Sequence, residues 1–131
     1  MILLDTHIWV WYLDNSDLLS RDALSHLEHA KERGAVYVSS ISVWEVCMLE
    51  KKGRISFSIP VNEWIQKSER LSYFNFIPID NAIAEKSVGL NSELHSDPAD
   101  RIIIATALTR KYPLITKDAK IIDYERVPTI W

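Results

Sequence analysis

The chain has 131 residues, of which 47% are hydrophobic, so its size and composition fit one domain with a single core. Fifteen Lys and Arg against 18 Asp and Glu give a formal net charge of -3, which argues against holding nucleic acid by charge alone. No apolar run approaches the roughly 20 residues of a membrane span, and one cysteine excludes an internal disulfide. We therefore expect a single cytoplasmic domain over residues 1–131, without membrane association.

Short apolar runs alternate with helical patterns in the first part of the chain. The run at 2–4 predicts a strand that is buried on both faces, and Asp5 stands at its carboxyl end. Ligands bind at this edge of open parallel sheets, so Asp5 is a candidate site residue, although it could equally cap the following helical turn. We expect an amphipathic helix over 18–33 and a second strand over 35–38.

The segment 41–49 predicts a helix that is apolar on almost every side, and it contains one acid. Glu45 shares a face with Ile41 and Met48, where a lone carboxylate is costly unless it is paired, protonated or bound to a cation. The alternative is a capping box formed by Ser42 and Glu45. Cys47 lies in the same run, and we expect it to pack rather than to act as a reactive thiol.

The rest of the chain continues the alternation of helices and strands. The expected elements are a helix over 61–73, a third strand over 75–79, a helix over 82–90 capped by Asp80, a loop over 91–96 and a fourth strand over 114–116. Asp118 follows the fourth strand, so it occupies the same kind of position as Asp5.

Another helix is expected to begin at Asp97-Pro98, because Asp is a good N-cap and Pro suits the first helical position. Asp100 then lies in the first turn, above a stripe that contains Ile103, Ile104 and Ala107. This acid thus heads an apolar face that should be buried. The alternative is that Asp97 and Asp100 only cap the helix and interact favourably with its dipole.

Together, these elements predict a three-layer α/β/α sandwich around a parallel sheet of about four to five short strands. Right-handed crossovers would bring the strand that ends at Asp5 beside the strand that ends at Asp118, with two helix N-termini at the same edge. Four carboxylates could then converge, those of Asp5, Glu45, Asp100 and Asp118.

Converging carboxylates repel one another unless a cation lies between them. No set of His or Cys residues suits zinc, so the oxygen ligands favour Mg²⁺, with Mn²⁺ as a substitute. Such an ion can activate a water for attack on a phosphodiester, which makes phosphodiester hydrolysis the fitting reaction. Thr6 and Thr116 could hold the metal-bound water or a carboxylate, and Arg101 could contact phosphate or pair with an acid.

Five motifs also occur in a familiar order, namely Leu3-Leu4-Asp5-Thr6-His7, segment 39–45 with Trp44-Glu45, Lys52-Gly53-Arg54, Asp97-Pro98-Ala99-Asp100-Arg101 with Ala105-Thr106-Ala107, and Thr116-Lys117-Asp118. In these motifs the chain resembles the PIN-domain ribonucleases, specifically the VapC-type toxins. The resemblance implies a PIN-like fold and Mg²⁺-dependent endoribonuclease activity on RNA, with the four acids as metal ligands. It also implies a homodimer that is held in check by a cognate antitoxin. Asp97 matches the family pattern as well.

Other classes of function must be weighed against this one. A receiver domain would need a second acid beside Asp5, where Thr6 and His7 follow instead, and His7 likewise argues against haloacid-dehalogenase-type phosphatases. The alternative that stays open is a non-catalytic acidic module that docks a basic partner. We interpret Trp9 as packing either in the core or at an interface. For a homodimer, exposed aromatic residues such as Trp9 or Trp131 are the suspected contacts.

Overall fold

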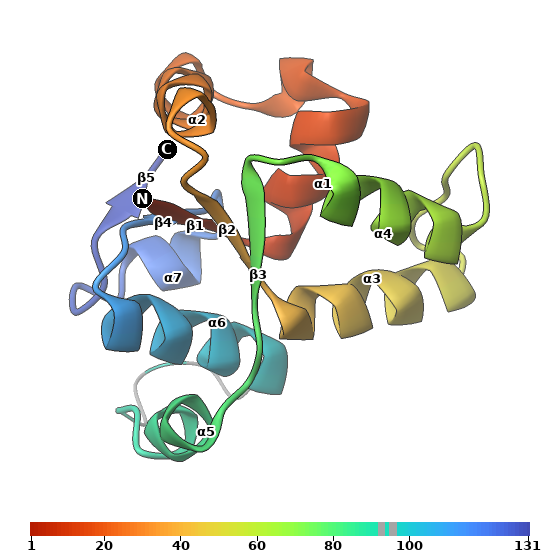
Figure 1. Ribbon diagram of the computed structural model, residues 1–131. Helices are drawn as coiled ribbons and strands as arrows, with labels where there is room; N and C mark the ends of the chain where they lie inside the picture. Colours follow the sequence, from red (N-terminus) through yellow and green to blue (C-terminus); the bar gives the residue numbers. More distant parts are fainter. Residues whose placement is uncertain (92–93, 95–96) are drawn as a thin grey trace.

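The computed structural model describes residues 1–91, 94 and 97–131, and it contains one parallel sheet with helices on both faces (Figure 1). The strand order is β3-β2-β1-β4-β5, and every neighbouring pair is parallel. The strands are β1 (Ile2–Leu4), β2 (Val36–Ser39), β3 (Phe74–Ile77), β4 (Leu114–Ile115) and β5 (Thr129–Ile130). The predicted α/β class is therefore confirmed, with β1 and β4 adjacent as expected.

Helices cover the two faces of the sheet in separate groups. The helices are α1 (Thr6–Asp14), α2 (Arg21–Glu32), α3 (Ser40–Lys51), α4 (Val61–Arg70), α5 (Asn81–Val88), α6 (Pro98–Arg110) and α7 (Ala119–Ile122), with a 3-10 turn at Ser16–Leu18. Residues of α1, α2 and α4 form one apolar core, and residues of α5, α6 and α7 form the other. In the described part of the chain, no helix is long and apolar enough to cross a membrane.

The central strand β1 contributes to both cores because its side chains alternate between the faces of the sheet. Ile2 and Leu4 belong to the core under α1, whereas Leu3 belongs to the core under α6. Burying a side chain of this kind contributes about 1.5–3 kcal/mol, so the strand is anchored from both sides. The position of Asp5, directly after it, is fixed accordingly.

Several predicted boundaries shift because of the residue that caps each helix. Ser20 accepts a hydrogen bond from Ala23 N, so α2 begins after it rather than at residue 18. Ser39 caps α3, which places Ser42 inside the helix, so the alternative of a capping box formed by Ser42 and Glu45 does not hold. The helix expected over 61–73 already ends at Arg70, where Leu71 becomes extended. Of the predicted loop 91–96, residues 92–93 and 95–96 lie outside the described residues.

Burial decides two expectations, in favour of core packing for Trp9 and against packing for Cys47. Trp9 is fully buried, with its ring 4.8 Å from that of Trp64 and 5.6 Å from that of Phe76, so it cannot be a dimer contact. The helix α1 turns this residue under the sheet instead of toward solvent. Cys47 is exposed rather than packed, because α3 buries only Ser42 and Val46.

Arg101 joins the start of α6 to the end of α5. Its guanidinium group donates three hydrogen bonds, to the backbone oxygens of Ser87 (3.1 Å), Leu90 (2.8 Å) and Leu94 (3.4 Å). The last carbonyls of a helix lack partners within the helix and carry partial negative charge, which a cation satisfies. Arg101 was expected either to contact phosphate or to pair with an acid. Its hydrogen bonds to backbone carbonyl groups are a third role, which the sequence did not suggest.

Replacing Arg101 should therefore reduce stability. We expect Arg101→Met to lower the free energy of unfolding by about 1–3 kcal/mol, because it leaves carbonyl groups without their charged donor. Urea denaturation followed by circular dichroism measures the change. Arg110→Met, at the exposed end of the same helix, is the matched control, and an equal loss in both variants would contradict this role.

Candidate active site

Acidic side chains from four separate segments meet at the carboxyl edge of the sheet. Asp5 follows β1, Asp118 follows β4, Glu45 lies on α3 after β2, and Asp97 and Asp100 lie at the start of α6. The carboxylate of Asp100 interacts electrostatically with all four others. The convergence predicted for Asp5, Glu45, Asp100 and Asp118 is therefore present, and Asp97 joins them.

Asp5 is the most deeply placed of these acids, with 9% of its surface exposed. One carboxylate oxygen accepts a hydrogen bond from Thr6 N (2.8 Å), which makes Asp5 the N-cap of α1. The other oxygen accepts from Thr116 Oγ1 (2.7 Å). Burial raises the pKa of Asp5, and both hydrogen bonds oppose that rise because they favour the charged form. Asp5 thus combines the two roles that the sequence left as alternatives.

Glu45 is held by the hydroxyl group of Thr6, which is in turn hydrogen-bonded to the hydroxyl group of Ser42. Thr6 Oγ1 donates to Glu45 Oε1 (2.5 Å) and lies 2.8 Å from Ser42 Oγ. A threonine hydroxyl has one proton, so the serine must donate the second bond. Burial raises the pKa of Glu45, the Thr6 bond lowers it, and the nearby charges of Asp5 and Asp97 raise it. Sequence analysis considered Ser42 only as a helix cap. Its position three residues before Glu45, which puts both side chains on one face of the helix, was the signal that could have placed Ser42 in the site.

Thr116 couples the two strand-end acids. Its hydroxyl donates to Asp5 and accepts a hydrogen bond from Asp118 N (3.1 Å), and the residue is fully buried. Asp118 in turn caps α7, with one oxygen accepting from Lys120 N (2.9 Å). Thr6 and Thr116 were expected to hold either a metal-bound water or a carboxylate. In the structure, each hydroxyl group holds a carboxylate.

Asp97 and Asp100 differ in environment although both lie in the first turn of α6. Asp97 is exposed and caps the helix, accepting hydrogen bonds from Ala99 N (2.9 Å) and Asp100 N (3.2 Å). Burial, followed by the charges of the neighbouring acids, raises the pKa of Asp100 to about 8. A carboxyl group this perturbed, in a cleft of like charges, is typical of a functional site.

Comparison with known proteins agrees with this arrangement. The family model of the PIN domain matches residues 2–127. The chain belongs to the PIN-domain family. Ribonuclease VapC22 of Mycobacterium tuberculosis is 34% identical to this PIN domain over 132 residues, which cover 99% of this chain and 98% of the relative. The resemblance to VapC-type proteins is thereby confirmed.

Solved structures extend the comparison to the fold. A toxin–antitoxin complex from Klebsiella pneumoniae contains a chain that matches this PIN domain with a TM-score of 0.65 and 28% identity, covering 100% of this chain and 97% of that one. VapBC2 from Rickettsia felis, bound to a promoter DNA fragment, matches with a TM-score of 0.72, covering 98% and 97%. At 18% identity, the second likeness concerns the fold alone.

The acids of this PIN domain suit a hard divalent cation that keeps much of its water. All the donors are oxygen atoms, which Mg²⁺ prefers, and their mutual repulsion favours a positive ion among them. Among the described residues, no group of three or more His, Cys, Asp or Glu side chains is arranged so that it could hold a metal ion by itself. Mg²⁺ is usually bound through only one or two carboxylates with waters completing its shell, so this looser arrangement fits it.

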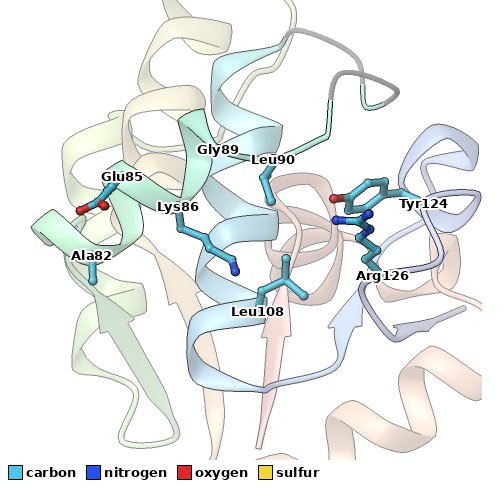
Figure 2. Close-up of a pocket in the computed structure, with 8 residues that line it drawn as sticks. All are labelled: Ala82, Glu85, Lys86, Gly89, Leu90, Leu108, Tyr124 and Arg126. Carbon is cyan, nitrogen blue, oxygen red and sulfur yellow. The ribbon is translucent and has the colours of Figure 1, made fainter.

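Three cavities of the PIN domain differ in their relation to the acids. A groove of about 480 Å³ beside Glu45 and Asp97 has apolar walls formed by Ile41, Trp44, Met48, Pro98 and Ala99. A hollow of about 390 Å³ contains Asp118. A third cavity, of about 610 Å³, lies between α5, α6 and the segment after α7, and none of the acids of the site lines it (Figure 2). Lys86 and Arg126 extend toward it in Figure 2.

The raised pKa of Asp100 makes the stability of the metal-free protein depend on pH. Between its ordinary value of 3.8 and about 8, the folded state binds more protons at this position than the unfolded state does. The free energy of unfolding therefore falls as pH rises through that window. Asp100→Asn removes the titrating group, so the variant should melt at a higher temperature than the wild type at about pH 9, and the difference should be much smaller at about pH 5, near the lower end of that window.

Differential scanning fluorimetry in EDTA measures both melting temperatures. Asp80→Asn is the control, because Asp80 is an exposed N-cap on α5 away from the cleft. If Asp100→Asn and the wild type show the same difference in melting temperature between the two pH values, Asp100 is not the group responsible.

Proposed function

We propose that this PIN domain is a Mg²⁺-dependent endoribonuclease and the toxin of a toxin–antitoxin pair. The observation that carries the proposal is the cluster of acids around Asp100, where burial first and then the charges of Asp5, Asp97, Glu45 and Asp118 raise the pKa of Asp100. The similarity to a protein named Ribonuclease VapC22 supports RNA as the substrate. Clustered carboxylates of this kind weaken the fold unless they bind a cation, so their presence is better explained by catalysis than by stability.

Each residue of the cleft has a distinct proposed role. Asp5, Glu45, Asp100 and Asp118 are the catalytic acids and hold the cation, directly or through its waters, and Mn²⁺ can substitute for Mg²⁺. When bound, the ion neutralises charge at the phosphodiester and lowers the pKa of the attacking water. Thr116 and Thr6 keep the carboxylates of Asp5 and Glu45 oriented by the hydrogen bonds already described.

Asp97 and Arg101 act on the site through the backbone of α6. Asp97 caps the helix and so places Asp100 in its first turn, and it adds negative charge at the rim. Arg101 fixes the same turn against the end of α5. We assign both residues a positioning role, because their side chains are already engaged with the backbone.

A cognate antitoxin is the proposed partner, and the chain is proposed to form a homodimer. The matching structure from Klebsiella pneumoniae is a toxin–antitoxin complex, which supports such a partner. The groove beside Glu45 and Asp97 has apolar walls and two acids at its rim, so it suits a segment that carries apolar side chains and a basic residue. A bound segment of this kind would block access to the acids.

Cleavage of RNA tests the proposal directly. We expect the purified chain to cut total cellular RNA in Mg²⁺, and EDTA or Asp100→Asn to reduce the rate by about 100-fold or more, since each disrupts metal binding. Thr116→Val should cost about 10- to 100-fold, because it leaves Asp5 without its buried hydroxyl donor. Mapping of new RNA ends by sequencing measures the cuts.

Asp80→Asn serves as the control and should cleave at the wild-type rate. If folded wild-type protein that binds Mg²⁺ leaves every RNA intact, the nuclease proposal fails. The alternative of an acidic module that docks a basic partner would then account better for the cleft.

A further inference from the structure

A lysine side chain lies over two neighbouring tryptophan rings next to the acids of the candidate site. Lys117 Nζ is 5.9 Å from the ring centroid of Trp11 and 5.7 Å from that of Trp131. The centroids of the two indole rings are 6.4 Å apart, with an interplanar angle of 60°. A cation at these distances is attracted by the faces of the rings, so the three side chains hold one another in place.

The pairing of the last two strands builds this cluster. Strand β5 lies parallel to β4 with Ile130 opposite Ile115, and Thr116 N donates to Ile130 O (3.3 Å). Trp131 therefore continues β5 beside the residues that follow β4. Trp11 comes from α1, which begins at the neighbouring strand end and also presents His7, whose ring centroid lies 5.9 Å from that of Trp11.

The cluster opens on the same edge as the catalytic acids. The hollow of about 390 Å³ is lined by His7, Ile8, Trp11, Lys117 and Asp118, so one candidate metal ligand forms part of its wall. Lys117 is exposed, whereas Trp11 and Trp131 are half-buried and thus present part of each ring to solvent. Among the described residues, no carboxylate oxygen lies within 4.0 Å of Lys117 Nζ, which leaves its charge available to an external anion.

We propose that this hollow binds one unpaired nucleotide of the RNA next to the phosphodiester that is cut. The base stacks on the face of Trp11, and Lys117 contacts the adjoining phosphate. Aromatic faces combined with a cation are the features by which proteins bind single-stranded nucleic acid, and stacking requires a base that is not paired. This inference rests on the proposed nuclease function, and it adds a nucleotide site outside the group of acids.

Two variants separate the contributions of stacking and charge. Trp11→Leu keeps an apolar side chain against the core but removes the aromatic face, and Lys117→Met keeps the aliphatic stem but removes the charge. Both are made in the Asp100→Asn background so that RNA is bound without being cut. Lys31→Met is the matched control, because Lys31 Nζ lies 5.0 Å from the ring centroid of Tyr73, outside the hollow.

Binding of a short fluorescein-labelled single-stranded RNA of mixed sequence is followed by anisotropy in Mg²⁺ at several salt concentrations. We expect Trp11→Leu to weaken binding by roughly 5- to 100-fold, the range for loss of one stacked base. Lys117→Met should reduce the slope of log K against log salt by about 0.7, the value for one lost phosphate contact on a single strand. Lys117→Arg should restore the slope, and duplex RNA of the same sequence should bind the Asp100→Asn parent less tightly than the single strand does.

Cleavage assays in the wild-type background distinguish this inference from the function on which it rests. Trp11→Leu and Lys117→Met should raise KM with little change in kcat, because the hollow binds RNA but does not touch the reacting atoms. If both variants bind and cut RNA as the wild type does, the nucleotide site is refuted while the nuclease stands. If the wild type cuts no RNA, the proposed function fails; if it binds no single-stranded RNA, the nucleotide site fails.

Discussion

The candidate site depends on bringing like charges together at one edge of the sheet, where Asp5 is buried and Glu45, Asp100 and Asp118 are half-buried. Asp5 is the centre of this arrangement, since both of its oxygens are occupied by hydrogen bonds from Thr6 N and Thr116 Oγ1. Those bonds stabilise the ionised form, while burial and neighbouring acids oppose it. Without a cation, the group is neutralised by a proton instead: burial and the neighbouring acids raise the pKa of Asp100 to about 8. A proton and a metal ion are thus competing means of neutralising the same cleft.

The scaffold tolerates this repulsion because the acids lie on elements that are anchored elsewhere. Strand β1 is buried on both faces, and α6 buries Ile103 and Ile104 completely below its first turn. Each fully buried aliphatic side chain contributes about 1.5–3 kcal/mol, so a few of them offset the cost of a raised carboxyl pKa. Arg101 adds a direct link between α6 and α5. The charged edge can therefore be unfavourable locally while the fold as a whole remains stable.

Sequence analysis identified the features that local chemistry determines and missed those that depend on tertiary contacts. The strand before Asp5 and the cap at Asp97 follow from residue patterns within a few positions. Strand β5 was not located, because its two residues form a strand only by pairing with β4. The sequence left Trp9 open between the core and an interface, since α1 is apolar on several sides and only packing against Trp64 decides which ring is buried. The link from Thr6 to Glu45 joins residues 39 positions apart and has no local pattern.

The acidic net charge of -3 no longer conflicts with RNA as a substrate once the positions of the charges are known. Much of the excess acid is gathered in one cleft, where a divalent cation would cancel it, so the net charge overstates the repulsion that an approaching strand meets. Next to these acids, Lys117 lies against two indole rings, and it forms no ion pair with an acid among the described residues. Affinity would then come from a bound cation and from stacking rather than from a broad basic surface. A protein built in this way needs few phosphate contacts, so its binding should depend only weakly on salt.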